Sequence, residues 1–174
     1  MAATKSMTNN VKYNAISFET ASPQLQQLWR SAFGDSDDFI TAFFDLFDAE
    51  YHLHTLSLND TVLSALYALP FTIFSNGKEF SVAYIYAVVT DEAHRGKGLM
   101  SLLMKKVHEN LKSKGFVATV LLPASTWLCG YYEKLGYKMT LWSNSLSPKN
   151  IPTVMYLPLN EDFPEPITIH HLIQ

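Results

Sequence analysis

Hydrophobic and polar positions change their period along the chain near Tyr51. Before that point, apolar residues recur every three or four positions, which is typical of amphipathic helices. Ser22-Pro23 opens one such helix and Gly34 ends it, and a second begins at about Ser36. The apolar residues on their expected faces are Leu25, Leu28, Trp29, Ala32 and Phe33 in the first and Phe39, Ile40, Phe43, Phe44 and Phe47 in the second. A strand over Val11 to Glu19 precedes both.

Beyond Tyr51 the pattern favours strands, because β-forming residues gather in segments separated by turn residues. Asn76-Gly77 is a strong hairpin signal between two of these segments. The sequence therefore predicts a three-strand meander, with strands at His52 to Leu58, Thr61 to Phe74 and Glu79 to Thr90.

The second half alternates helices and strands. A helix from Leu99 has apolar residues at i, i+4 spacing and stops near Gly115. Phe116 to Leu122 is apolar on both faces, which indicates a central strand. Ser125 and Gly136 bracket a short helix over Thr126 to Leu135. The last strands are expected at Tyr137 to Ser143 and Thr153 to Leu159. The central strand–helix–strand unit implies parallel pairing within a mixed α/β sheet.

Composition agrees with one globular domain over residues 11–159, between a loose tail at 1–10 and an extension at 160–174. The chain has 174 residues, and 48% of them are hydrophobic. The net charge of -3 argues against nucleic-acid binding, which needs a basic surface. With one cysteine, a reducing compartment is expected. No uninterrupted apolar run of about 18 residues spans a membrane, and the polar N-terminus lacks a secretory signal, so a cytoplasmic location is expected.

The loop Arg95-Gly96-Lys97-Gly98-Leu99-Met100 joins the third meander strand to the following helix. A helix start exposes backbone N–H groups and the positive end of the helix dipole. Glycines let an anion approach that backbone, and Arg95 and Lys97 add positive charge. These features predict a phosphate or pyrophosphate site. The P-loop pattern is absent, and the dinucleotide fingerprint lacks its third glycine because Ser101 stands there. A tight turn with solvated cations is the alternative.

This loop resembles the acyl-CoA signature of the GNAT superfamily of N-acyltransferases, Gln/Arg-x-x-Gly-x-Gly/Ala. Tyr132-Glu133-Lys134-Leu135-Gly136-Tyr137 resembles the family's Tyr-x-x-x-Gly-Phe/Tyr segment at the expected distance downstream. The order of elements is similar as well. The resemblance covers about residues 11–159 and implies a twisted mixed sheet of about six or seven strands flanked by about four helices.

The resemblance implies an N-acetyltransferase that uses acetyl-CoA, without a metal, to acetylate a primary amine of a small molecule, peptide or protein. Tyr132 is the implied acid that protonates the leaving thiolate. The implied cofactor-binding residues are Val88, Val89, Thr90, Arg95, Gly96, Lys97, Gly98, Leu99, Met100, Ser101 and Ser125. The strand end at Val88 to Thr90 would supply the N–H donor for the oxyanion and pair with the pantetheine arm. A homodimer is compatible with this reading.

The match departs from the family pattern in three places. Met100 stands where the signature has Gly or Ala, and Ser125 stands where relatives often carry an Asn. The strand Val117 to Leu122 has no carboxylate where some relatives have a Glu base, so the general base is unassigned. The alternative functions are therefore an inactive acyl-CoA-binding regulatory module, or transfer of a different acyl group. The identity of the acceptor amine stays open.

Other polar residues have structural and functional readings side by side. His52 and His54 alternate along a strand and could bind a metal or include a base, but surface or packed histidines are the better expectation. His94 is expected to pack against the loop. Cys129 is more simply a small apolar residue than a nucleophile. Among Asp35, Asp37 and Asp38, helix capping is the preferred reading, and attraction of a cationic amine is the alternative.

Overall fold

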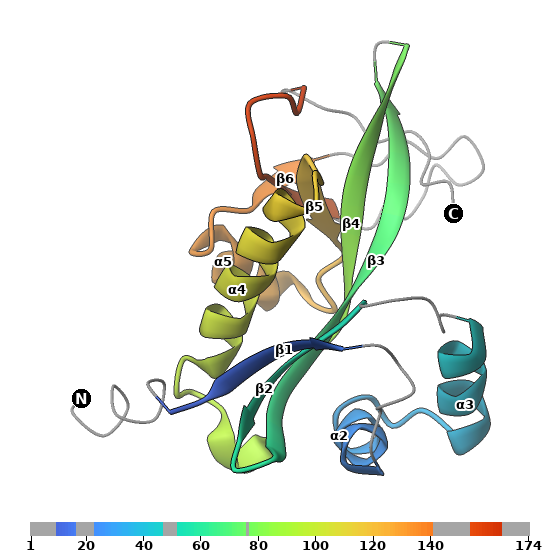
Figure 1. Cartoon of the computed structure of the whole chain (residues 1–174), viewed down its shortest axis with the longest axis vertical. Coiled ribbons are helices and arrows are strands. Elements are labelled where there is room, and N and C mark those ends of the chain that lie inside the picture. The colour runs from blue at the N-terminus through green and yellow to red at the C-terminus, as the bar shows by residue number, and fades with distance from the viewer. Residues whose placement is uncertain (1–9, 17–22, 47–51, 76, 141–153, 165–174) are drawn as a thin grey trace. The chain divides into compact units, whose positions relative to one another are not determined.

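The computed structural model describes residues 10–16, 23–46, 52–75, 77–140 and 154–164, with the side chains of residues 16, 44–46 and 75 left out (Figure 1). The described elements, in chain order, are β1 (Lys12–Ile16), α2 (Pro23–Phe33), α3 (Asp37–Leu46), β2 (Leu53–Leu58), β3 (Thr61–Ser75), β4 (Lys78–Thr90), η2 (Glu92–His94), α4 (Leu99–Ser113), β5 (Ala118–Leu121), α5 (Thr126–Glu133), β6 (Lys138–Thr140) and β7 (Val154–Pro158).

The strands form one seven-stranded sheet in the order β1-β2-β3-β4-β5-β7-β6. The pair β4 and β5 is parallel, while β1–β2, β2–β3, β5–β7 and β6–β7 are antiparallel. With α2, α3, α4 and α5 this is a mixed α/β fold, and it confirms the predicted fold class. The predicted meander and the parallel pairing around the central strand are both present.

Two compact units make up the chain, and each is described by itself. Met1–Ala68 with Tyr86–Val107 form unit 1, and Leu69–Ile85 with His108–Gln174 form unit 2. The cofactor loop predicted from the sequence belongs to unit 1, and the Tyr132 segment belongs to unit 2. The prediction of a single domain over residues 11–159 stays a prediction.

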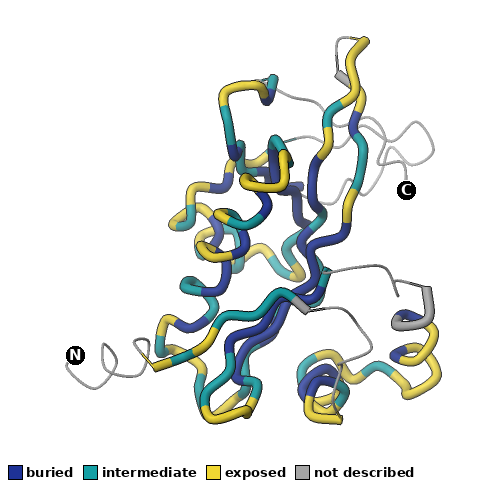
Figure 2. Tube along the Cα trace, in the orientation of Figure 1, coloured by how far each residue is buried: buried dark blue, intermediate teal, exposed yellow. Residues whose placement is uncertain are grey.

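Unit 1 is built around the buried faces of α2, α3, β2 and the first half of β3. Leu25, Leu28 and Trp29 of α2 are buried, as their helical spacing predicts. The expected apolar face is wrong at Phe33 and Phe39, which are 43% and 46% exposed. Both lie at the border of the apolar stripe, where a helix residue turns toward solvent. Figure 2 shows much of β2 and of the first half of β3 buried, whereas β1 and much of the outer helix surface are intermediate or exposed.

Unit 2 has its core on β5 and β7. All four residues of β5 are buried, as expected for a strand that is apolar on both faces. The core cluster consists of Ile73, Val82, Ala118, Val120, Val154, Tyr156 and Phe163. Gly136 follows α5 and has a φ of 93°. A Cβ atom placed at Gly136 would lie 3.2 Å from Cδ1 of Leu157. A side chain there would meet both backbone strain and this leucine.

Helix caps follow the sequence in one place and depart from it in another. The Ser36 hydroxyl accepts a 3.2 Å hydrogen bond from the Phe39 N–H at the start of α3. Ser125 occupies the N-cap position of α5 but makes no capping bond with its side chain, so this part of the prediction is wrong. Its extended backbone places it at the cap without directing the hydroxyl to the helix N–H groups.

Several predicted features lie outside the described residues. They include the tail at 1–9, the strand ends at 17–19 and 141–143, Asn76, Thr153 and the extension beyond 164. The side chain of Phe44, together with Phe47, also falls outside the described part of the chain.

Candidate functional site

The end of β4 leads into the candidate site and is anchored within unit 1. The hydroxyls of Thr90 and Ser64 lie 2.9 Å apart, and the Asp91 N–H donates to the Leu63 carbonyl at 2.9 Å. Ala87 has a φ of 49°, which is unusual for a residue with a side chain. Regular extended backbone is therefore interrupted just before Val88, and the anchors fix where Thr90 ends the strand.

The loop after β4 uses its charged side chains to hold its own backbone. Arg95 donates from Nε to the Thr90 carbonyl at 3.1 Å, and Lys97 donates from Nζ to the Ala93 carbonyl at 2.8 Å. His94 Nδ1 lies 2.6 Å from Asp91 Oδ1, so the histidine packs on the loop as expected. Both cations remain beside the loop glycines, and each keeps further N–H donors for a ligand.

Two glycines with positive φ turn the loop into α4. Gly96 and Gly98 have φ angles of 72° and 76°, which residues with a Cβ rarely adopt. The Gly98 carbonyl accepts the first helical bond, from the Leu102 N–H at 3.1 Å. The N–H groups of Leu99 and Met100 consequently have no acceptor within the helix, as at any helix start. The loop thus presents backbone donors and a positive dipole end to an anion.

The first residues of α4 divide between the core and the surface. Leu99 is 1% exposed and locks the helix start against the interior. Met100 and Ser101 are half-buried at the following positions. Met100 therefore stands in the first helical turn, where the signature has a smaller residue, with part of its side chain accessible.

Tyr132 lies in unit 2 on α5, with its ring 5.2 Å from that of Tyr131 and 5.7 Å from that of Tyr137. The residue is buried, and its hydroxyl makes no hydrogen bond with any described residue. Burial, with a smaller contribution from Tyr131, raises the pKa of Tyr132 to about 12. The phenol is consequently protonated at neutral pH and has its proton available for donation.

Tyr137 has the opposite environment. Its hydroxyl lies 3.0 Å from His108 Nε2 and 2.8 Å from Thr119 Oγ1, inside unit 2. Burial raises the pKa of Tyr137 well above its ordinary value, and burial lowers the pKa of His108 to about 4. A neutral histidine, a phenol and a threonine thus satisfy one another's hydrogen bonds. Sequence reasoning missed this network, although a threonine within an apolar strand was a usable signal.

The remaining candidates lie in different environments. His54 is 1% exposed and its Nδ1 lies 2.8 Å from the Tyr13 hydroxyl, so it is a packed histidine. His52 precedes β2, where its carbonyl accepts a 2.9 Å bond from the Ala68 N–H. Cys129 is a free, half-buried thiol. Ser125 is half-buried, and the absence of a capping bond leaves its hydroxyl free of that structural role.

The acidic residues between α2 and α3 separate into different roles. Asp37 forms an ion pair with Arg30, and Asp37 and Asp38 occupy the first turn of α3, as the capping reading predicts. Asp35 departs from that reading because its Oδ2 accepts a 2.8 Å hydrogen bond from the Trp29 indole.

A mixed sheet with a glycine turn leading into a helix start is an arrangement suited to binding an anionic group. The model of the acetyltransferase (GNAT) domain matches residues 16–140, so the chain belongs to the GNAT family. This confirms the predicted family and the class of enzyme domain, an acyltransferase. A comparison with curated protein sequences gives no match.

Solved structures share the fold. A GCN5-related N-acetyltransferase from Kribbella flavida is 24% identical with a TM-score of 0.65, covering 74% of this chain and 34% of that one. One from Anabaena variabilis is 24% identical with a TM-score of 0.60, covering 75% and 32%. The ribosomal-protein-S18-alanine N-acetyltransferase from Escherichia coli is 16% identical with a TM-score of 0.60, covering 88% and 98%. This chain therefore spans about a third of the Kribbella and Anabaena proteins.

Among the residues that the structure describes, no helix combines the length and apolar character needed to cross a bilayer. The same residues hold no group of three or more His, Cys, Asp or Glu side chains arranged for a metal ion.

Proposed function

We propose that this protein is an N-acetyltransferase that moves the acetyl group of acetyl-CoA directly to a primary amine of a small molecule, peptide or protein. The observation that carries the proposal is the turn at Gly96 and Gly98. Their positive φ angles let the chain turn from the loop into the start of α4. A helix start beside two cations suits the CoA pyrophosphate. Family membership then selects CoA over other phosphate ligands.

The cofactor is held by β4 and the loop in this proposal. Arg95, Gly96, Lys97 and Gly98 cradle the pyrophosphate, with Leu99, Met100 and Ser101 at the helix start. β5 pairs with β4 at Val82, Ala83 and Tyr84, and β4 continues past this ladder to Thr90. The backbone of Val88, Val89 and Thr90 can pair with the pantetheine arm as a further strand would. Ser125, whose hydroxyl has no capping bond, is the proposed polar contact to the cofactor arm.

The transfer forms an N–C bond and breaks the C–S bond of the thioester. The neutral amine attacks the carbonyl carbon, and a backbone N–H at the end of β4 stabilises the oxyanion. The tetrahedral intermediate collapses and expels the CoA thiolate. The amine nitrogen releases a proton to water, and the thiolate gains one from the acid described next. That acid is reprotonated from water, so protons and charge balance.

Tyr132 is the proposed acid for the thiolate. Its pKa of about 12 keeps the phenol protonated throughout the neutral range. Its hydroxyl is unoccupied among the described residues, whereas the Tyr137 hydroxyl already serves two partners. This difference favours Tyr132 over Tyr137 as the donor.

We further propose that the protein acts in the cytoplasm. Its ligands are an acyl-CoA and an amine, and its reaction needs no metal. Its single cysteine suits a reducing compartment. Its net charge of -3 gives no basis for nucleic-acid binding. A homodimer is compatible with these properties.

A thiol-release screen with acetyl-CoA tests the proposal over polyamines, aminoglycosides, amino acids and peptides. Peptides with free N-termini belong in the panel because the Escherichia coli neighbour is named for acetylating a protein alanine. Amine-dependent thiol release is expected. Acetyl-CoA binding without release for any amine would instead favour an inactive regulatory module. Faster release from a longer acyl-CoA would indicate a different acyl donor, and absence of any acyl-CoA binding would contradict all three.

A further inference from the structure

The chain after α5 closes in a turn that joins Tyr132 to Tyr137. The Tyr137 N–H donates to the Tyr132 carbonyl at 3.1 Å. A second bond, from the Gly136 N–H to the Glu133 carbonyl at 2.9 Å, completes a Schellman motif with its glycine at a φ of 93°. This motif commonly brings its first and last side chains together, and here the two tyrosine rings lie 5.7 Å apart. Backbone and ring contacts therefore both tie the position of Tyr132 to that of Tyr137.

Two side chains on one face of the sheet hold the far end of this turn. Thr119 of β5 is paired with Leu157 of β7 across an antiparallel ladder, so their side chains lie on the same face. The Thr119 hydroxyl lies 2.8 Å from the Tyr137 hydroxyl. Cδ1 of Leu157 would lie 3.2 Å from a Cβ atom at Gly136, which leaves little room for a side chain there. The sheet thus fixes the last two residues of the turn.

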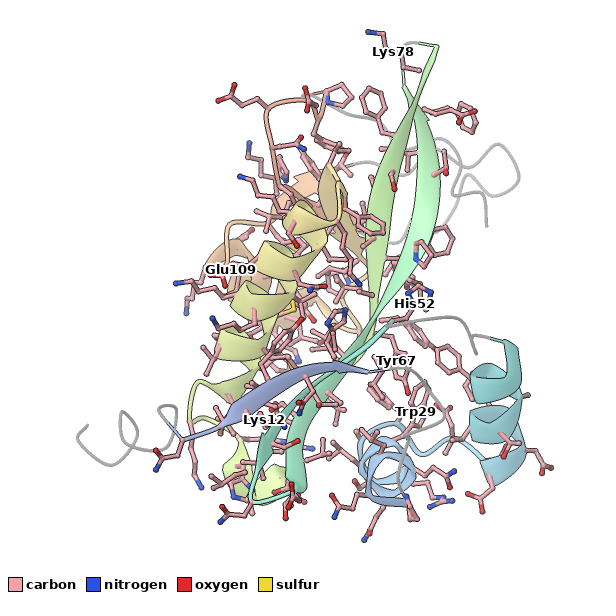
Figure 3. The ribbon with its side chains drawn as sticks, viewed as in Figure 1. Lys12, Trp29, His52, Tyr67, Lys78 and Glu109 are labelled. Atoms are coloured by element: carbon pink, nitrogen blue, oxygen red, sulfur yellow. The ribbon has the colours of Figure 1, made fainter. Side chains whose placement is uncertain are left out.

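Helix α4 holds the same tyrosine hydroxyl from another element. His108 Nε2 lies 3.0 Å from the Tyr137 hydroxyl, and the two rings lie 5.7 Å apart. His108 directly precedes Glu109, which Figure 3 labels on α4. Directly after Tyr137, β6 begins at Lys138 and pairs with β7. Tyr137 is therefore fixed at its hydroxyl by α4 and β5, and the strand that follows it fixes its backbone.

The Tyr132 phenol depends on these contacts for its position. Its ring is buried and contacts the rings of Tyr131 and Tyr137, but its hydroxyl makes no hydrogen bond with any described residue. A proton donor has to come within hydrogen-bond reach of the atom that it protonates. A misplacement of about 1 Å can cost about 100-fold in rate. Movement of the turn or of the neighbouring ring would therefore carry the Tyr132 hydroxyl away from the leaving group.

We propose that Thr119 and His108 are positioning residues, which hold the Tyr137 hydroxyl and thereby set where the Tyr132 phenol lies when the thiolate leaves. The inference rests on the proposed function, in which Tyr132 is the acid. The proton passes from the Tyr132 oxygen to the CoA sulfur, and the positioning residues exchange no proton with the substrate. A purely structural role would change stability, whereas a positioning role changes the rate through the Tyr132 hydroxyl.

Thr119→Val is the central variant, because it removes the hydroxyl and keeps a side chain of similar shape. We expect kcat to fall about five- to tenfold, while KM for acetyl-CoA changes less than about twofold. Thr119→Ser keeps a hydroxyl and should retain a kcat within about twofold of the wild type. Thr55→Val makes the same change as the central variant at a buried threonine of β2, outside the network, and should leave kcat within about twofold.

A double-mutant cycle with Tyr132→Phe separates positioning from instability. If Thr119 acts through the Tyr132 hydroxyl, Thr119→Val should lower kcat less than about twofold in the Tyr132→Phe background. A merely structural role would lower kcat by the same factor in both backgrounds. Thermal unfolding of each variant identifies a temperature at which every protein is folded, and all rates are measured there.

Fluorine NMR of the protein labelled with 3-fluorotyrosine reads the position of Tyr132 without turnover. The Tyr132 resonance is the one that disappears in Tyr132→Phe. We expect it to shift or broaden in Thr119→Val and to stay in place in Thr119→Ser and Thr55→Val. Absence of turnover with every amine, or full turnover in Tyr132→Phe, would count against the proposed function. The resonance alone would then decide whether the network positions Tyr132.

The inference is supported if Thr119→Val moves the Tyr132 resonance and lowers kcat only where Tyr132 keeps its hydroxyl. It is overturned if Thr119→Val and Thr55→Val change kcat alike, if the loss of kcat is equal in both backgrounds, or if the Tyr132 resonance does not move. Should Thr119→Val fail to fold, Tyr137→Phe removes the same hydrogen bond from its other partner. A kcat unchanged from the wild type in folded Tyr137→Phe would then contradict the inference, and a five- to tenfold fall of about the expected size, absent in the Tyr132→Phe background, would support it.

Discussion

The loop after β4 and the network around Tyr137 treat their polar groups in opposite ways. In the loop, Arg95 and Lys97 bond to nearby carbonyls, and the start of α4 keeps backbone N–H groups without helical acceptors. In the network, the buried Tyr137 hydroxyl is shared between the half-buried His108 and the buried Thr119. The first arrangement leaves donors for a ligand, and the second uses up its donors to stabilise the fold.

Tyr132 packs beside the buried network, yet its hydroxyl keeps a donor for a ligand. Its ring packs 5.7 Å from that of Tyr137, but its hydroxyl makes no bond with a described residue. If Tyr132 is the acid proposed above, this motif contains one tyrosine for stability and one for chemistry. Hydrogen-bond occupancy distinguishes them, because burial alone does not.

The largest expected effect separates the two tyrosines. Tyr132→Phe should lower kcat by about 100-fold, since it removes a proton donor, and should leave the free energy of unfolding nearly unchanged. Tyr137→Phe should lower the free energy of unfolding by about 1 to 3 kcal/mol, because it leaves His108 and Thr119 without their shared partner. Thiol-release kinetics and urea unfolding measure the two quantities on both variants.

The opposite pattern would break the comparison. If Tyr137→Phe lost turnover while staying as stable as the wild type, or if Tyr132→Phe kept full turnover from pH 6 to 9, the assignment of the acid would be wrong. For the wild type, the proposed acid itself causes no loss of rate below about pH 10, because the pKa of Tyr132 is about 12.

The next effect concerns pH and stability. The pKa of His108 is lowered to about 4 in the folded protein, against 6.5 as its ordinary value. Between these values the unfolded chain binds more protons, so the stabilisation present above about pH 6.5 is lost as pH falls toward 4. We expect unfolding free energy to drop by about 2 kcal/mol from pH 7 to pH 5.

Urea unfolding at both pH values checks this expectation against His108→Gln, which has no titrating ring. The variant should lose less stability than the wild type over the same range. Equal pH dependence in the two proteins would show that His108 is not the group responsible.

A smaller effect sharpens the account of the loop. Gly98→Ala forces a Cβ into a φ of 76°, which costs about 1 to 2 kcal/mol. Gly77→Ala imposes a similar strain at a φ of 73° in the turn before β4. Both variants should be destabilised, but only Gly98→Ala should weaken acetyl-CoA binding, by about tenfold, because it alters the helix start. Equal loss of affinity in both would indicate a general effect of instability.

The smallest effect is electrostatic. Lys97→Met should weaken acetyl-CoA binding about two- to fivefold at low salt, and raising the ionic strength should shrink the difference. Lys78→Met is the matched control, because Lys78 is exposed at the start of β4. Calorimetric titrations of acetyl-CoA at two salt concentrations measure the affinity of both variants. A loss that is independent of salt would point to the Ala93 bond as the cause.

Much of the fold follows from local patterns in the sequence. The spacing of Leu25, Leu28 and Trp29 predicts α2, and the apolar run at Ala118 to Leu121 predicts the central strand. The burial of residues at the border of a helix's apolar face is harder to predict from sequence. Phe33 and Phe39 satisfy the helical period yet face solvent. Their exposure depends on which neighbouring elements cover the helix, and that information is not local.

The candidate site is similarly divided. The glycine turn and the helix start are local, so Gly96 and Gly98 could be predicted from the sequence. The partners of Asp35 and Tyr137 could not, because the Trp29–Asp35 bond and the Thr119–Tyr137 bond depend on how separate elements pack. Capping preference alone assigned Asp35 to the start of α3, whereas its carboxylate accepts a hydrogen bond from the Trp29 indole N–H.

A calorimetric titration of acetyl-CoA into the wild type, Gly98→Ala and Tyr132→Phe tests the central claim most directly. We expect saturable binding to the wild type and to Tyr132→Phe with similar affinity, and about tenfold weaker binding to Gly98→Ala. Absence of binding to the wild type, or equal affinity in all three proteins, would contradict the assignment of the Arg95 to Met100 loop as the cofactor site.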